Sequence, residues 1–227
     1  MQISFSEHIL AYYKNLKPHW RLPAGVDLIY PFDNSQVWTL MEAFYSKFYS
    51  DTTERHFLFG INPGRLGAGM TGIPFTDPIH LKTACGIDNE VPKKHELSSI
   101  FIYNMIEELG GVKEFYSSFY ISSLCPLGFT KEGKNYNYYD SKELYKAVRP
   151  KMIAAIERQI DRYCKKDKAY SLGQGKNFKI FQELNEEYNW FEEVIPLPHP
   201  RWVMQYKRKT MRVYLDEYQV KLLDTES

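Results

Sequence analysis

The chain carries one stretch that decides its fold, and it reads Gly60-Ile61-Asn62-Pro63-Gly64-Arg65-Leu66-Gly67-Ala68-Gly69-Met70-Thr71-Gly72-Ile73-Pro74-Phe75. Five glycines and two prolines fall within these 16 residues, a content that predicts neither a helix nor a further strand. The apolar run at residues 56–59, directly before it, is typical of a buried strand. Because glycine has no Cβ, a ligand can approach such a backbone closely. We therefore expect a binding loop at the exit of a buried strand, with Asn62 as its polar side chain.

Common nucleotide-binding loops do not account for this stretch. Residues 67–72 match the glycine spacing of a dinucleotide-binding loop, but Ile73-Pro74 blocks the helix that such a loop should open. No Gly-Lys-Ser or Gly-Lys-Thr follows, as a phosphate-binding P-loop would require. The remaining alternative is a plain turn, since Asn-Pro-Gly is also a common turn sequence. We expect no nucleotide cofactor and no other cofactor.

Length and composition bound the class of protein. A chain of 227 residues with a formal net charge of +1 predicts a single domain over residues 1–227 that is not a polycation. Cys85, Cys125 and Cys164 lack the spacing of a zinc site and are too few for a four-cysteine iron–sulfur site, so no metal is expected. Sparse cysteine favours a reducing compartment, and no apolar run approaches the length of a membrane span. We expect a cytoplasmic monomer.

Helices and strands are predicted to alternate along most of the chain. Strands are expected at residues 56–59, 119–123, 169–173 and 193–197, and residues 128–139 are expected to form a surface loop. This alternation predicts an α/β fold, with a central, mainly parallel four-stranded sheet flanked by helices. Helices are expected at residues 4–16, 35–49, 98–109, 140–163 with a bend at Pro150, 177–188 and 203–223.

Three strand exits carry polar residues together with proline, at residues 60–64, 122–127 and 197–201. In a parallel sheet these exits meet at one edge, where ligands bind. His199 lies between two prolines that restrict its backbone, so it is a stronger candidate than the other histidines. The basic residues after it suit a phosphate backbone, although a solvated helix face would have the same composition. They include Arg201, Lys207, Arg208 and Lys209, with Trp202 beside the first.

At this point the chain resembles a known family. Residues 60–75 are similar to the first motif of the uracil-DNA glycosylase superfamily, in particular its single-strand-selective monofunctional family, in a divergent bacterial branch. Residues 197–200, Leu-Pro-His-Pro, resemble the second motif, and Cys125-Pro126-Leu127 resembles a third segment. Order and spacing agree from roughly residue 23 to residue 223. The resemblance implies a three-layer fold and a DNA glycosylase that hydrolyses the bond between uracil and deoxyribose in base excision repair.

The resemblance also assigns roles to individual residues. Asn62 would orient the attacking water, because an amide cannot accept its proton as a carboxylate would. His199 would donate a hydrogen bond to uracil O2 and stabilise the charge on the departing base. Phe75 would stack on the extruded base, and Ile61 and Gly64 would lie against the target nucleotide. Arg201 and Trp202 would form the wedge that fills the vacated place in the base stack, and Lys207, Arg208 and Lys209 would bind DNA.

One departure from the family pattern changes the expected substrate range. Ser123 stands where the family has the asparagine that reads the base. A hydroxyl lacks the fixed pair of donor and acceptor that an amide offers, so the pocket is expected to accept deaminated purines such as xanthine beside uracil. The segment assigned to the wedge is also shorter than in the family: Arg201 follows Pro200 directly, where the family has Ser-Pro-Arg. Two other functions stay open: a glycosylase-like protein that binds DNA or damaged bases without efficient hydrolysis, and a nucleoside or nucleotide hydrolase.

Overall fold

The computed structural model describes residues 3–223. Its central sheet has four parallel strands, as the sequence predicts, and their order is β3-β2-β6-β7. Pro196 lies in β7 at the edge of this sheet, where a strand tolerates a residue without an N–H group. The four strands are β2 (Arg55–Gly60), β3 (Phe119–Ser123), β6 (Cys164–Leu172) and β7 (Glu193–Leu197).

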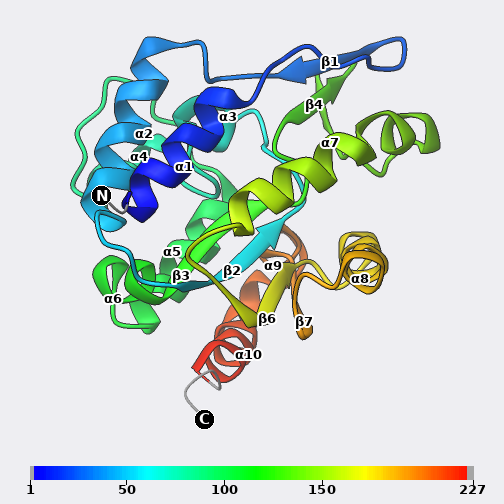
Figure 1. Ribbon diagram of the computed structural model, residues 1–227. Helices are drawn as coiled ribbons and strands as arrows, with labels where there is room; N and C mark the ends of the chain where they lie inside the picture. Colours follow the sequence, from blue (N-terminus) through cyan, green and yellow to red (C-terminus); the bar gives the residue numbers. More distant parts are fainter. Residues whose placement is uncertain (1–2, 224–227) are drawn as a thin grey trace.

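Helices cover both faces of the central sheet and give three layers (Figure 1). On one face Phe57 and Tyr120 pack against Phe5 of α1 (Phe5–Asn15), and Phe59 packs against Phe181 of α8 (Lys176–Tyr188). On the other face the Tyr170 hydroxyl donates to a carbonyl of α10 (Met211–Leu223). The remaining long helices are α2 (Ser35–Phe48), α5 (Leu97–Glu108) and α7 (Lys142–Ile160), and α6 (Val112–Ser118) is a shorter one.

A second, antiparallel sheet corrects one sequence prediction. The segment expected to be a surface loop forms β4 (Gly128–Lys131) and β5 (Lys134–Tyr136), and β4 pairs with β1 (Val26–Ile29). Glu132 and Gly133 connect the hairpin with positive φ angles of 51° and 69°, as a tight two-residue turn requires. A Cβ at Gly128 would overlap the carbonyl oxygen of Pro63, so this sheet packs directly against the glycine-rich loop.

Several element boundaries also differ from the prediction. The glycine-rich stretch contains one helical turn, α3 (Ala68–Thr71), which ends at Gly72 with φ 74°. The following polar stretch contains α4 (Pro78–Thr83), and β6 begins five residues before the predicted start. The expected C-terminal helix is divided into α9 (Pro200–Tyr206), the short 3-10 helix η1 (Arg208–Thr210) and α10. The helix expected over residues 140–163 is α7, which runs over residues 142–160 with Pro150 inside it.

Candidate active site

The exits of three parallel strands line one cavity of about 600 Å³, as the sequence predicts. β2 leads into Ile61 and Asn62, β3 ends at Ser123, and β7 leads into His199. Asn62 and His199 are 137 positions apart in the chain and face the same space. Gly64, Phe75, Arg201 and Trp202 also line this cavity, so it contains both predicted catalytic residues and all four predicted base-binding residues.

Backbone groups hold the side chain of Asn62 in one orientation. The N–H of Tyr138 donates to Asn62 Oδ1 at 3.1 Å. Nδ2 in turn donates to the carbonyl oxygens of Pro63 at 3.3 Å and Tyr136 at 3.4 Å. Tyr136 and Tyr138 belong to the end of β5 and the residues after it, so the hairpin supports the amide. Oδ1 keeps a second lone pair that can accept a hydrogen bond from a water molecule.

His199 is fixed as a neutral imidazole. It is the N-cap of α9, and its Nδ1 accepts a hydrogen bond from the backbone N–H of Arg201 at 3.1 Å. Burial, and then the positive charge of Arg201, lower the pKa of His199 to about 4. A neutral ring whose Nδ1 is an acceptor carries its proton on Nε2. The side chain is therefore a hydrogen-bond donor through Nε2 at neutral pH.

Phe75 lies over the bare backbone of Gly60. Its φ of 54° is in the left-handed region, which is rare for an aromatic residue and is found at functional sites. A Cβ at Gly60 would stand 2.6 Å from Cε2 of Phe75, so only glycine leaves room for this ring. The Phe75 ring centroid is 6.4 Å from that of His199. An aromatic face, an imidazole donor and an amide acceptor thus surround one space.

The floor of the cavity contains the residue that departs from the family pattern. Ser123 is the last residue of β3, is paired with Gly60 in the sheet and is 6% exposed. Its hydroxyl can donate one hydrogen bond and accept two, and it can rotate to do so. This position can therefore satisfy bases with different edges.

The rim of the cavity is built by α9. Arg201, Trp202 and Tyr206 line it and are exposed, with Tyr206 70% exposed and Trp202 41% exposed. The ammonium group of Lys207 lies over the Trp202 ring at 5.8 Å. Lys207, Arg208 and Lys209 are exposed and continue away from the cavity, which they do not line. Tyr206 was not among the predicted residues, although an aromatic residue one helical turn after Trp202 is a signal for it.

Several further cavity residues, among them Lys134, Asn135, Asn137 and Glu96, were missed by sequence reasoning. The hairpin contributes Lys134, Asn135 and Asn137, and Asn135 accepts from the backbone N–H of Arg65 at 3.2 Å. Residues 128–139 were expected to be a surface loop, so no signal placed them here. Glu96 also lines the cavity. Burial, and then the negative charge of Asp77, raise its pKa to about 7, whereas the positive charge of Arg201 lowers it. Glu96 is one polar residue in a long polar stretch, so the sequence gives no signal that it lines a cavity.

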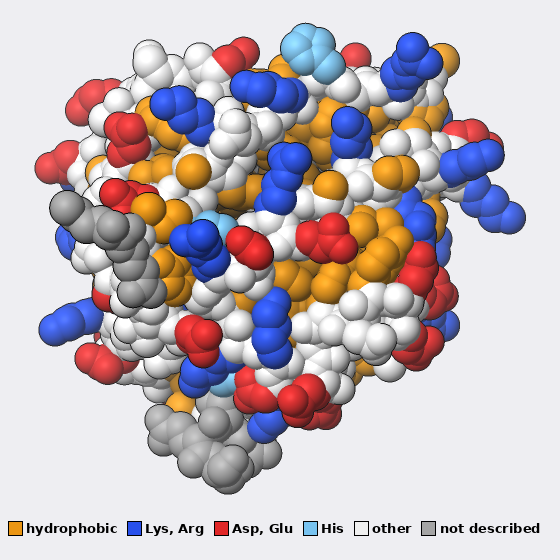
Figure 2. Space-filling view, in the orientation of Figure 1, with side chains coloured by type: hydrophobic (Ala, Val, Ile, Leu, Met, Phe, Trp, Pro, Cys, Tyr) orange, Lys and Arg blue, Asp and Glu red, His pale blue; other side chains and the backbone are white. Residues whose placement is uncertain are grey.

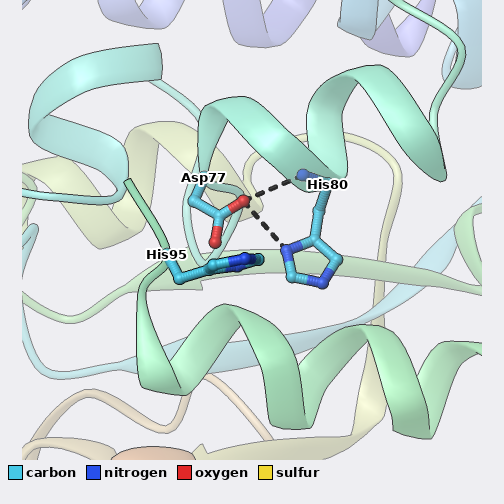
Figure 3. A group of neighbouring side chains, drawn as sticks. All are labelled: Asp77, His80 and His95. Atoms are coloured by element: carbon cyan, nitrogen blue, oxygen red, sulfur yellow. Dashed lines mark hydrogen bonds and ion pairs between the residues drawn. The ribbon is translucent and has the colours of Figure 1, made fainter. Parts of the chain in front are cut away.

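One group of possible metal ligands lies in the region that the structure describes, made of Asp77, His80 and His95 (Figure 3). Asp77 Oδ1 accepts from the backbone N–H groups of Ile79 and His80 and from His80 Nδ1, at 3.1, 2.8 and 2.9 Å. Asp77 Oδ2 accepts from the backbone N–H of Glu96 at 3.0 Å. The carboxylate is thus occupied as the cap of α4, and these bonds fit a structural network better than a ligand set.

The comparisons with known proteins agree with this architecture. The sequence matches the uracil DNA glycosylase superfamily over residues 46–223, and the chain belongs to this superfamily. It is a DNA glycosylase of the uracil-DNA glycosylase type, in the class of enzymes that begin base excision repair. Among solved structures it is similar to wild-type Pedobacter heparinus SMUG2, with 42% identity and a TM-score of 0.95 over 99% of this chain and 100% of that chain. A comparison with curated protein sequences gives no match.

The surface is mixed in charge. Figure 2 shows lysine and arginine side chains interspersed with acidic ones on the face it presents, in keeping with the formal net charge of +1. Attraction to DNA would then depend on local groups such as those at the rim of the cavity. None of the helices between residues 3 and 223 is long and apolar enough to cross a membrane.

Proposed function

We propose that the protein is a monofunctional glycosylase that removes uracil, and also deaminated purines such as xanthine, from DNA. The observation that carries this proposal is the convergence of Asn62 and His199 on one cavity, each oriented by backbone hydrogen bonds. A protein that only binds DNA would not need a fixed acceptor for a water molecule. A cavity of about 600 Å³ accommodates one nucleobase with its sugar.

In the proposed reaction the target nucleotide leaves the base stack and enters the cavity. Phe75 stacks on the base, and Asn62 Oδ1 accepts a hydrogen bond from the water that attacks C1′. The N-glycosidic bond breaks with its electron pair going to the base, and His199 Nε2–H donates to uracil O2, where negative charge builds. The water oxygen bonds to C1′ and its proton is released, so the products are a free base and an abasic site.

The rim supplies the contacts that recognise DNA in this proposal. Arg201 and Trp202, with Tyr206 as a further candidate, would fill the gap that the extruded nucleotide leaves. Lys207, Arg208 and Lys209 would contact phosphates, and their contribution would weaken as salt concentration rises. We propose that the chain acts as one domain and as a monomer, without a metal or other cofactor, on DNA in the cytoplasm or the bacterial nucleoid.

Single-site oligonucleotides test the activity. Duplex and single-stranded DNA with uracil, xanthine, hypoxanthine or thymine at one position is incubated with the protein and then treated with alkali, which nicks abasic sites. Wild type is expected to nick at uracil. Asn62→Ala and His199→Ala should each slow excision by about 100- to 1,000-fold, the usual cost of removing one oriented polar group. Asn104→Ala removes an exposed amide on α5 and is the matched control.

The same assay separates the alternatives. If the wild type binds abasic DNA but releases no base, the protein is a binding module and the proposal is wrong. Hydrolysis of free deoxyuridine in preference to the oligonucleotide would indicate a nucleoside hydrolase. Lys134 lines the cavity, and a lysine there could form a Schiff base with the abasic site. Borohydride would trap such a complex covalently, and a monofunctional glycosylase is expected to give none.

A further inference from the structure

Glu96 is the acidic side chain that lines the cavity, and the glycosylase reaction outlined above does not use it. It immediately precedes α5, and its backbone N–H donates to Asp77 Oδ2 at 3.0 Å. The side chain turns toward the glycine-rich loop. A Cβ at Gly67 would overlap Glu96 Oε2, and a Cβ at Gly64 would lie 3.5 Å from Oε1. The carboxyl group therefore packs against the bare backbone of the loop that lies beside Asn62.

This carboxyl group lacks partners within the fold. Between residues 3 and 223, neither a hydrogen bond nor an ion pair reaches its oxygen atoms. The residue is half-buried and no donor within the described fold compensates the charge, so its ionised form is disfavoured. Burial accordingly raises the pKa of Glu96 to about 7. Near neutral pH the group is thus close to the point where it exchanges its proton.

The surrounding charges push its protonation in opposite directions. Asp77 is buried, which disfavours its charge, but hydrogen bonds from His80 and from the backbone N–H of Glu96 outweigh this and lower its pKa. Asp77 is therefore an anion, and it raises the pKa of Glu96, whereas Arg201 lowers it. Several ionisable side chains face Glu96 or share its cavity: Asp77 before α4, Arg65 from the glycine-rich loop, Lys134 from the hairpin, His199 after β7 and Arg201 from α9. His80 and His95 lie close to Asp77.

DNA would change this balance in one direction. A base that occupies the cavity leaves its sugar and phosphates toward the solvent, and three exposed cations, Arg65, Lys134 and Arg201, line this cavity. A phosphate there lies near Glu96 as a second negative charge, and it also engages the cation that favours ionisation of Glu96. Both effects favour the neutral carboxyl group.

We propose that Glu96 is a positioning residue that takes up a proton as DNA binds. In its ionised form it repels the incoming phosphate and attracts the positive charge of Arg201, with which it forms no ion pair in this structure. In its neutral form it leaves Arg201 free for the phosphate and can donate a hydrogen bond to it. This inference rests on the proposed function, since it requires that the cavity accept a nucleotide within DNA.

The sign of the pH dependence follows from this linkage. If bound DNA raises the pKa of Glu96 above its value in the free protein, the complex holds more protons than its separate components in that window. Affinity is then highest below about pH 7 and falls as pH rises through the two pKa values. A rise of one pKa unit corresponds to about a tenfold loss of affinity across the titration.

Fluorescence anisotropy tests the proposal. The probe is a labelled oligonucleotide with a tetrahydrofuran abasic analogue, which cannot be processed. Its affinity is measured at constant ionic strength from about pH 5.5 to about pH 8.5, the range in which a group with a pKa near 7 titrates. The wild type should lose about tenfold in affinity over this range. E96Q carries a permanently neutral isostere and should bind at high pH as tightly as the wild type does at low pH, without that step.

A matched variant separates a local effect from a change in net charge. E186Q removes an exposed carboxyl group on α8, outside the cavity lining, and should keep the pH dependence of the wild type. Thermal unfolding verifies that E96Q is folded, and the ¹³C NMR titration of the carboxyl groups shows whether Glu96 titrates near 7 and shifts upward with DNA.

The outcomes distinguish this inference from the proposed function. If the wild type excises uracil and E96Q, although folded, keeps the full pH dependence of binding, the inference is wrong and the proposed function stands. A Glu96 resonance that titrates at the usual pH for a glutamate also overturns it. If the wild type neither binds abasic DNA nor releases a base at any pH, both are wrong.

Discussion

The ring of Phe75 occupies the space that a side chain at Gly60 would fill: a Cβ at Gly60 would stand 2.6 Å from Phe75 Cε2. Gly60 is the last residue of β2, and Phe75 ends the glycine-rich loop with a left-handed φ of 54°. The loop thus returns to the strand from which it starts. Its two ends together place the aromatic face of the cavity.

Gly60→Ala is expected to displace the Phe75 ring and to slow excision. If the displaced ring no longer stacks on the base, the lost interaction is worth about 1 to 3 kcal/mol. An added methyl group in a packed site lowers the free energy of unfolding by about 1 to 3 kcal/mol. The measurement is the single-turnover rate of uracil excision, together with the melting temperature. Ser118→Ala on the exposed surface of α6, away from the cavity, is the control. A Gly60→Ala variant with the wild-type rate would show that the position of Phe75 does not matter for excision.

His199 is expected to remain neutral well below the usual pKa of histidine. Burial and Arg201 lower its pKa in the folded protein to about 4, against 6.5 for a free side chain. The folded state therefore binds fewer protons than the unfolded state between these two values. The neutral ring contributes its full stabilisation above about pH 6.5, and this is lost as pH falls toward about 4. Histidine NMR should show the Nε2–H tautomer at pH 7 and titration of His199 near pH 4.

Stability measurements complete this test. His199→Gln cannot gain a proton, so its free energy of unfolding should fall less than that of the wild type between about pH 6.5 and about pH 4. An imidazole of His199 that titrates near its usual pKa in the folded wild type would contradict the assignment of a neutral Nε2–H donor.

Arg55 is expected to matter for stability and not for the site. It is fully buried between the rings of Phe5 and Tyr49, its Nε donates to the Tyr116 carbonyl oxygen at 2.7 Å, and it forms a bidentate pair with Asp51. Asp51 is 48% exposed, so Arg55→Met leaves no buried charge and the loss comes mainly from the buried hydrogen bond to Tyr116 and the packing of Arg55. The free energy of unfolding should fall by about 1 to 3 kcal/mol. Urea unfolding measures it.

The free energy of unfolding at acid pH gives an independent test of this pair. Hydrogen bonds from Arg55 are the main cause that lowers the pKa of Asp51 to about 2. The pair therefore stabilises the fold fully above about pH 4, and this contribution is lost as pH falls toward about 2. Arg55→Met should lack that loss while excising uracil at the wild-type rate where it is folded. A variant as stable as the wild type would mean that the apolar side chain replaces the pair without cost.

The sequence predicts the sheet edge that lines the cavity because that edge depends on local patterns. Alternating helices and strands imply a parallel sheet, and a parallel sheet brings the exits at Gly60, Ser123 and Leu197 to one side. The support of Asn62 follows from no such pattern. The N–H of Tyr138 that holds its amide lies 76 positions away, and the sequence predicts a loop there.

Short strands and buried charge explain the remaining differences. β4 and β5 have four and three residues, and their polar residues, such as Lys131, Lys134 and Asn135, hide the alternation that reveals a strand. Glu132-Gly133 is a weaker turn signal than Asn-Gly. Glu96 is an ordinary polar residue by sequence. Its raised pKa results from tertiary burial against the glycine-rich loop, which no local pattern encodes.

Ser123→Asn is expected to narrow the range of bases that the enzyme removes. Ser123 is buried at the end of β3 beside Gly60, and its hydroxyl can rotate to suit different base edges. An amide presents a donor and an acceptor in fixed directions, which match a carbonyl and the N–H of uracil. A deaminated purine offers the same pair of groups on a larger ring, displaced from these directions. One mismatched buried hydrogen bond is worth about 1.4 kcal/mol, so the ratio of uracil to xanthine excision should rise about tenfold.

Single-turnover rates on oligonucleotides with uracil, xanthine or hypoxanthine measure this ratio, with Ser118→Asn on the exposed surface of α6 as the control. Rates rather than binding are compared, because the amide must favour one base in the transition state to change specificity. A general loss of rate on all bases would indicate that the larger side chain obstructs the cavity, and the affinity for uracil-containing DNA would then be reduced as well. If the relative rates on all three bases stay the same, Ser123 does not read the base.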